Sequence, residues 1–269
     1  MDQGHKQGRP AAGDIEARRR DFMEGVMSKP EKPSEVTESG DPIYRHSQPA
    51  DRQIPRGRPS TEKISEHIEK YLGKVDSIFH EFLSDTVHID VFRVNPRAEF
   101  PFFSLITSGM SDLPMSVPPE VDAPRYLELM ITLPGDWKFD DKSLRDESWY
   151  WPVRLIKMLA LLPHKHGTWL GWGHSIPNGD PPLPYAENTK LCCALIWPPV
   201  TSADGFRTLT ISREKEIHFF AIVPLYKEEM DLKLRSGMNV LLNKLGQANV
   251  NDIVDLSRPN VARKRFGLF

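Results

Sequence analysis

The composition of the chain changes sharply near residue 60, and this change limits which part of the chain can fold. Residues 1–60 contain seven Pro and six Gly but no Leu, Trp or Cys, and eleven Lys and Arg nearly cancel ten Asp and Glu. Ordering a backbone costs about 1–2 kcal/mol per residue, and so few apolar side chains bury too little surface to offset it. We therefore expect a disordered tail and linker over 1–60, a folded domain over 61–262 and a basic C-terminal tail over 263–269.

Apolar periodicity within the folded part predicts three helices and six strands. Apolar side chains from Ile64 to Phe82 recur at helical spacing, and Ser60 or Thr61 can cap this first helix. A second helix is predicted from near Trp151 until just before Pro163, because proline is tolerated in the first turn but not in the interior. The third helix is predicted over 227–245. Alternating apolar and polar residues or β-rich runs predict strands over 86–94, 102–108, 126–133, 191–197, 206–212 and 217–225.

The predicted order is helix, three strands, helix, three strands, helix. Strands in two runs of three, without strict alternation with helices, favour an α+β fold with a mainly antiparallel sheet packed against helices. The only cysteines, Cys192 and Cys193, are adjacent on one predicted strand. Neighbouring strand residues point to opposite faces, so we expect two reduced, buried thiols rather than a disulfide.

Charge and hydropathy exclude several classes of partner. The chain has 35 Lys and Arg against 37 Asp and Glu, a formal net charge of −2, whereas nucleic-acid surfaces usually carry a strong basic excess. No apolar run approaches the roughly 18 residues that span a bilayer, and the N-terminus lacks the apolar core of a secretion signal. We expect a cytoplasmic protein that binds neither nucleic acid nor membrane. No glycine-rich phosphate loop is present, and no cofactor is expected.

A histidine cluster gives the alternative hypothesis of a metal-dependent enzyme. His164 and His166 form an H-x-H pair, and His174 follows eight residues later, so that three imidazoles could bind zinc or iron. Lys165 between the pair would repel a cation, and the next carboxylate is Asp180. No G-x-S-x-G nucleophile motif is present either, so we expect a protein that is not an enzyme.

An aromatic loop gives the preferred hypothesis of a protein-binding surface. Trp169 and Trp172 lie among glycines and are followed by His174, Asn178 and Asp180. Aromatic and histidine side chains presented by a loop on a rigid scaffold are typical anchors for a partner protein. The alternative for this loop is a tryptophan-lined edge of the core that glycines turn.

Four sequence blocks, in order, resemble the suppressor-of-fused (SUFU) family. They are YLELMITLPGDW at 126–137, WGHSIPNGD at 172–180, FFAIVPLYKEEM at 219–230 and DLSRPN at 255–260. The second block contains the G-H-[ST]-I-P-N-G pattern of the family, and the resemblance extends over about 60–262. It implies a SUFU-like α/β sandwich without enzymatic activity.

The resemblance also implies what such a domain binds. In animal members this domain is the N-terminal half of the protein, and Gli transcription factors bind between it and a second domain. The animal groove also uses an acidic residue before the histidine, where this chain has Gly173, so only His174 is carried over. Bacterial stand-alone members are proposed to be immunity proteins that neutralise toxin domains of polymorphic toxin systems. The resemblance therefore implies a protein partner, and a toxin domain in particular.

Overall fold

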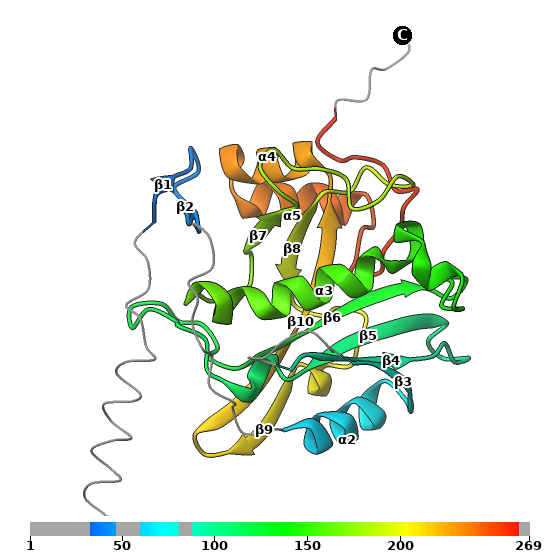
Figure 1. Ribbon diagram of the computed structural model, residues 1–269. Helices are drawn as coiled ribbons and strands as arrows, with labels where there is room; N and C mark the ends of the chain where they lie inside the picture. The colour runs from blue at the N-terminus through cyan, green and yellow to red at the C-terminus, as the bar shows by residue number, and fades with distance from the viewer. Residues whose placement is uncertain (1–32, 47–59, 81–87, 264–269) are drawn as a thin grey trace, which may run out of the picture.

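The structure is a computed structural model that describes residues 33–46, 60–80 and 88–263. Its centre is an eight-stranded sheet in the order β3-β4-β5-β6-β10-β8-β7, with β9 paired to β10 (Figure 1). The strands are β3 (Val75–Phe79), β4 (Asp90–Val94), β5 (Phe102–Ser108), β6 (Leu127–Pro134), β7 (Ser175–Pro177), β8 (Cys193–Trp197), β9 (Thr208–Ser212) and β10 (Lys215–Leu225). β6 and β10 run parallel, and the other pairs in this sheet are antiparallel. The predicted α+β fold with a mainly antiparallel sheet is confirmed.

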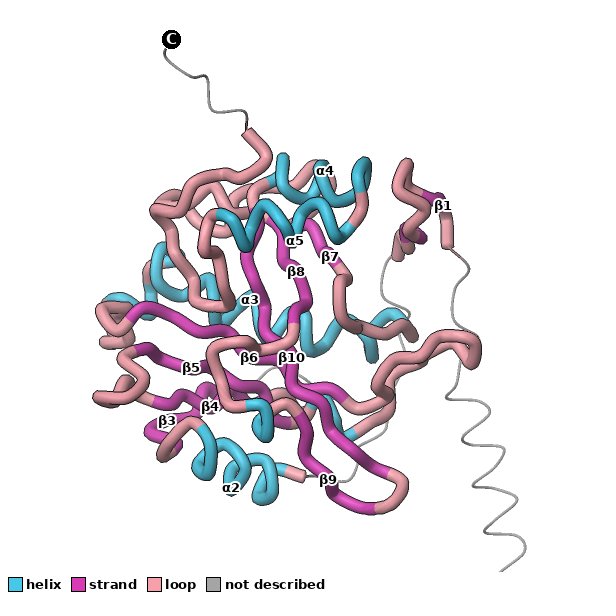
Figure 2. Tube along the Cα trace, turned by 180° about the vertical axis from the view of Figure 1, so that it is seen from behind, coloured by secondary structure: helices cyan, strands magenta, loops and turns pink. Residues whose placement is uncertain are grey.

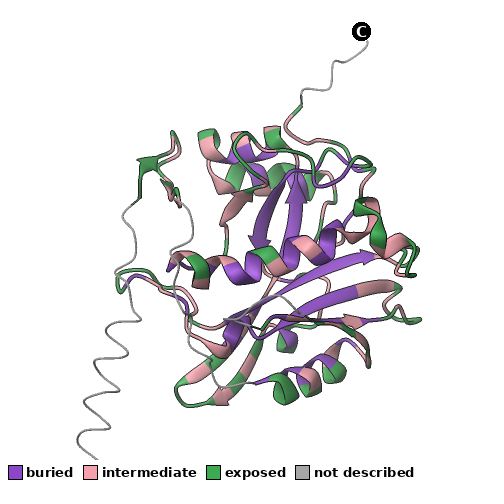
Figure 3. Cartoon of the chain, viewed as in Figure 1, coloured by how far each residue is buried: buried purple, intermediate pink, exposed green. Residues whose placement is uncertain are grey.

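Helices cover both faces of this sheet. α3 (Glu147–His166) lies across one face, and α2 (Thr61–Tyr71), α4 (Lys227–Ser236) and α5 (Met238–Gln247) lie on the other (Figures 1 and 2). Alternation along β10 explains these layers, because successive side chains of a strand point to opposite faces. Phe219 packs in the core beneath α2 and Val223 in the core beneath α4 and α5, whereas Ile222 packs in the core beneath α3 on the other face. Three short 3-10 helices, Met110–Asp112, Ser143–Arg145 and Asp204–Phe206, join the elements. The central strands β6 and β8 are almost wholly buried (Figure 3).

The first predicted helix is half the expected length. α2 ends at Tyr71, and the apolar residues that follow form strand β3 instead. Gly73 separates the two elements with φ of +116°, a conformation that side chains disfavour and that ends a helix. The prediction that this helix continues beyond Tyr71 was therefore wrong, and position 82 lies outside the described residues. β4 begins at Asp90 within the predicted strand 86–94, and positions 86 and 87 lie outside the described residues.

The other two helices also differ from their predicted bounds. α3 starts four residues before Trp151, where the Asp146 carboxylate accepts a hydrogen bond from Ser148 N, and it continues through Pro163 to the left-handed Gly167. An interior proline costs a helix about 3 kcal/mol, but this helix buries a long apolar face against the sheet, which offsets that cost. The single helix predicted over 227–245 is two helices, because Gly237 has φ of +86° and separates α4 from α5.

Residues 33–46, within the segment expected to be tail, form a small hairpin against the folded part. Its strands β1 (Glu35–Val36) and β2 (Pro42–Ile43) form a separate two-stranded sheet. Ser39 N donates to Leu234 O of α4 at 3.2 Å, and Tyr44 packs edge-on against Trp169 with ring centroids 5.0 Å apart. Residues 1–32, 47–59 and 264–269 lie outside the described residues, so the domain boundary near residue 60 stays a prediction.

Candidate protein-binding surface

The aromatic loop connects the end of α3 to the edge strand β7. Glycines shape it: Gly167 ends α3 with φ of +60°, and Gly173 turns the chain with φ of +82°. Gly173 N donates to Ile196 O of β8 at 2.9 Å, and Ile196 N donates to His174 O at the same distance. The loop is thus attached to the sheet through its backbone.

The two tryptophans of this loop have opposite environments. The Trp169 residue is 5% exposed and belongs to the core on the α3 face, where Tyr44 and His174 pack edge-on against it. Trp172 is 54% exposed. The core-edge interpretation therefore holds for Trp169. Trp172 is exposed, and its role as an anchor for a partner stays a prediction.

His174 lies half-buried between the loop and α4. Burial lowers the pKa of His174 to about 4, and the nearby Lys233 ammonium acts in the same direction. A hydrogen bond with the Trp169 backbone opposes this shift. Burial also lowers the pKa of Lys233, whose Nζ donates to Ser175 Oγ of β7 at 3.3 Å. At neutral pH the imidazole is therefore uncharged, and it can offer a hydrogen bond without a charge.

Asn178 and Asp180 follow β7 and have different roles. Asn178 Nδ2 donates to Leu183 O at 2.7 Å, and Asn178 N donates to Cys192 O at 2.8 Å. These bonds hold the loop after β7, and Asn178 is half-buried. The Asp180 side chain is 81% exposed and forms an ion pair with Arg45 of the hairpin, with Arg45 Nη1 3.1 Å from Asp180 Oδ2. Asp180 thus contacts the hairpin directly, and His174 packs against Trp169, which also contacts Tyr44 of the 33–46 segment.

β7 is the last strand at this end of the sheet order. Among the described strands it pairs with β8 alone, through the register Ser175 to Leu195, Ile176 to Ala194 and Pro177 to Cys193. The hairpin β1–β2 contacts α4 and the loop but belongs to its own sheet. An edge strand of this kind presents backbone N–H and C=O groups with which a further strand can pair.

The histidines of the metal-enzyme hypothesis do not converge. His164 Nε2 is 2.8 Å from Met110 O, the His166 ring packs against His46, and the His174 ring packs against Trp169. Within the described ranges, the three ligand groups close enough to share a metal ion are those of His80, His88 and Asp90, at the opposite end of the sheet order. A joint metal site of His164, His166 and His174 is therefore wrong for this fold: H-x-H spacing on a helix points the two rings in different directions.

Sequence reasoning missed a buried ion pair that joins two of the four blocks. Glu229 in the first turn of α4 and Arg258 in the DLSRPN block have side chains 0% and 6% exposed. Arg258 donates to both carboxylate oxygens of Glu229, at 2.7 and 2.6 Å, and also to Pro224 O at 2.9 Å. The acidic first turn and the distant arginine are both visible in the sequence, but no sequence pattern indicates that they form a pair.

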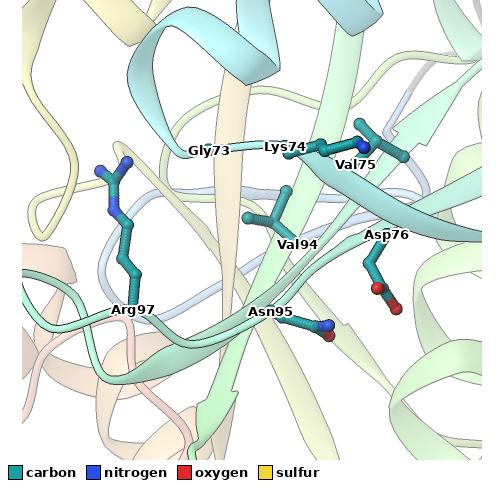
Figure 4. Close-up of a pocket in the computed structure, with 7 residues that line it drawn as sticks. All are labelled: Gly73, Lys74, Val75, Asp76, Val94, Asn95 and Arg97. Atoms are coloured by element: carbon teal, nitrogen blue, oxygen red, sulfur yellow. The ribbon is translucent and has the colours of Figure 1, made fainter.

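A shallow pocket of about 310 Å³ lies between the end of α2 and the β3–β4 edge (Figure 4). Its lining residues are Gly73, Lys74, Val75, Asp76, Val94, Asn95 and Arg97. Two of its charged groups already have partners, since Arg97 Nη2 donates to Tyr71 O at 3.1 Å and the Asp76 carboxylate pairs with Arg93. Because these two charged groups already have partners within the chain, a structural role is favoured for this pocket over ligand binding.

Cys192 and Cys193 are both free and buried, with sulfur atoms 3.8 Å apart. This arrangement agrees with the expectation of two unbridged thiols. Of the helices that the structure describes, none is long and apolar enough to cross a bilayer.

Comparison with known proteins identifies the family. The family model for suppressor of fused protein (SUFU) matches residues 85–259, so the chain belongs to the SUFU family. A SUFU homologue from Neisseria gonorrhoeae has a similar structure, with a TM-score of 0.57 and 17% identity over 76% of this chain and 97% of that chain.

Two further solved structures share the fold. The crystal structure of the Sufu–Fu complex matches with a TM-score of 0.53 and 15% identity, over 77% of this chain and 93% of that chain. Drosophila Suppressor of Fused matches with a TM-score of 0.50 and 15% identity, over 77% of this chain and 52% of that chain. No curated protein sequence matches the chain. The SUFU fold predicted from the four blocks is confirmed, and it is consistent with a protein-binding domain.

Proposed function

We propose that this chain binds another protein through a surface formed by Trp172, His174 and Asp180 together with the edge of β7 that no other described strand pairs with. The observation that carries the proposal is the 54% exposure of Trp172 on a loop whose backbone is bonded to β8. A few aromatic side chains on a preorganised surface supply most of the binding energy in typical protein interfaces. Trp172 is in that position.

The chemistry around Trp172 supports a polypeptide as the ligand. The β7 edge offers backbone hydrogen bonds to an extended segment, as in recognition by strand addition. The neutral imidazole of His174 and the exposed carboxylate of Asp180 add polar contacts on either side of this edge. One solved structure with this fold is a complex of Sufu with Fu, which supports protein binding as the role of the fold.

The finer proposal is that the partner is a toxin domain and that this chain is a cytoplasmic immunity protein. The resemblance to bacterial stand-alone SUFU members supports this role. An immunity protein acts by stoichiometric binding, so the proposal needs neither a cofactor nor a catalytic group.

The test is binding to the protein encoded next to this gene. We expect the wild-type chain to bind it and to protect cells that express it, and we expect Trp172→Ala to weaken affinity about thirtyfold, or about 2 kcal/mol. Val240→Ala, which truncates a 38% exposed side chain on α5, is the matched control and should leave affinity unchanged. Equal affinities of wild type and Trp172→Ala would refute the surface. Absence of protection by the wild type would refute the immunity role.

Thermal unfolding of Trp169→Ala and Trp172→Ala shows whether each tryptophan stabilises the fold or is instead available for binding a partner. Trp169→Ala removes a buried side chain and should destabilise the fold by about 3–5 kcal/mol. Trp172→Ala should leave the midpoint nearly unchanged, because surface substitutions usually change stability by less than about 0.5 kcal/mol. A large drop of the midpoint for Trp172→Ala would show that this residue supports the fold rather than a partner.

A further inference from the structure

Strand register brings three metal-ligand residues to one face at the β3–β4 edge. In the antiparallel pair, Ile78 lies opposite Phe92 and Phe79 opposite Val91, so the next step places His80 opposite Asp90. His88 precedes Asp90 by two residues, and residues two apart in extended chain project to the same side. The three side chains therefore meet although seven residues lie between the two histidines in the sequence.

Their ligand atoms lie at distances that suit coordination. Asp90 Oδ1 is 3.0 Å from His80 Nδ1 and 3.0 Å from His88 Nε2, and the three ligand atoms all lie within 4.8 Å of one another. Tetrahedral zinc with bonds of about 2.0–2.1 Å separates neighbouring ligand atoms by about 3.3 Å. The two distances to Asp90 Oδ1 are within a few tenths of an ångström of this value, and the two histidine nitrogens lie no more than 4.8 Å apart.

The backbone beneath this cluster is fixed. Asp90 pairs with Ser108 of β5, and the backbone oxygen of His88 lies only 2.1 Å from where a Cβ would stand on Gly109. The glycine thus lets the chain before β4 pack tightly against the end of β5. On the other strand, Lys157 of α3 donates to His80 O at 3.0 Å. Two exposed histidine rings and a half-buried carboxylate therefore stand on an anchored backbone.

We propose that His80, His88 and Asp90 bind one divalent transition-metal ion of the zinc type and link β3 to β4. Two imidazoles and one carboxylate suit zinc and its neighbours rather than magnesium or calcium, which prefer oxygen ligands. Three protein ligands leave a fourth position for water or a group from another molecule. The Lys157 ammonium adds a positive charge on this side, which weakens affinity without blocking the ligand atoms.

A simple histidine–carboxylate pair is the competing explanation, and the chain contains a matched example. His218 Nε2 lies 3.2 Å from Glu216 Oε1, and the described residues around this pair supply no third ligand within metal distance. At the proposed site, two rings share one carboxylate oxygen, and their centroids are 6.4 Å apart. A divalent ion would contact both rings and the carboxylate at once, whereas without an ion each neutral ring can donate its own N–H to Asp90 Oδ1, so metal titration decides between the two explanations.

The test uses the full chain without a histidine tag, treated with chelator and titrated with zinc or cobalt chloride by calorimetry and absorption. We expect one equivalent of metal at micromolar affinity, with a cobalt spectrum typical of tetrahedral coordination. His88→Ala and Asp90→Ala should each weaken binding at least tenfold, whereas His218→Ala should not. Zinc should also raise the thermal midpoint of the wild type and not of His88→Ala, because binding to the folded state alone stabilises it.

Circular dichroism of the metal-free variants checks that they fold. We expect His88→Ala to fold, because the His88 side chain is exposed. Absence of stoichiometric binding by the wild type would overturn the proposal. So would undiminished binding by folded His88→Ala, or an equal loss in His218→Ala. None of these outcomes depends on the partner proposed for the β7 edge.

Discussion

Replacing Arg258 with Ala removes one partner of the buried ion pair that joins the two C-terminal sequence blocks. The variant loses two hydrogen bonds to Glu229 and one to Pro224 O. It leaves a carboxylate with 0% exposure that retains hydrogen bonds from Tyr226 N and Val261 N. Breaking a buried pair from one side typically costs about 3–5 kcal/mol, because the remaining charge has no counterion.

The neighbouring carboxylate provides the control. Glu228 pairs with Arg263 at 2.8 Å, but these side chains are 41% and 65% exposed. Exposed pairs contribute about 0–1 kcal/mol, so Arg263→Ala should leave stability nearly unchanged. The two variants thus remove arginines from adjacent glutamates and differ mainly in burial.

Thermal unfolding measures the difference. For a domain of this size, about 2–4 °C accompanies each kcal/mol, so Arg258→Ala should lower the midpoint by about 6–20 °C. Replacing both Arg258 and Glu229 with apolar residues should not restore full stability, because Tyr226 N and Val261 N would lose their acceptor. Equal losses for Arg258→Ala and Arg263→Ala, or a loss below about 1 kcal/mol for Arg258→Ala, would refute this reasoning.

Three further predictions concern pH, packing and domain bounds. The pKa of His174 is about 4 in the folded chain against 6.5 ordinarily, so the free energy of unfolding should fall by up to about 3 kcal/mol as pH falls from 6.5 to 4. His174→Gln should reduce this slope in denaturant titrations, and an unchanged slope would contradict it. Gly109→Ala should lower the midpoint by many degrees, because its Cβ would stand 2.1 Å from His88 O and φ is +119°; an unchanged midpoint would disprove that packing. Limited proteolysis should leave a fragment beginning near Ser60, and early cleavage within β6 or β8 would show that the boundary is wrong.

The strands were the most predictable part of this protein. A β-rich run predicted the strand at 102–108, which has the bounds of β5, and the face made by Leu127, Leu129, Ile131 and Leu133 does pack against α3. These features depend on residues that are close in sequence. Side chains along a strand point alternately to the two faces of the sheet, so their pattern along the chain predicts the strand and its buried face. The four sequence blocks indicated the family, and the fold followed from it.

Helix ends were less predictable, because packing overrides local preference there. Pro163 should end a helix, yet α3 continues for another turn while its buried face contacts the sheet. Gly73 and Gly237 adopt left-handed conformations that divide apolar runs whose spacing alone fits continuous helices. Spacing cannot show where a glycine takes positive φ, because that choice depends on what the next element packs against.

The sequence by itself determined which side chains could act as anchors, ligands or charges, and tertiary structure decided which of them meet and which are exposed. Trp169 and Trp172 are three residues apart, but only the sheet edge makes one buried and the other exposed. Arg258 reaches Glu229 across 29 residues, and β-strand register alone brings His80 to Asp90. Burial and pairing between distant segments are properties of the packed chain, because they depend on surfaces that come together only when the whole sheet forms.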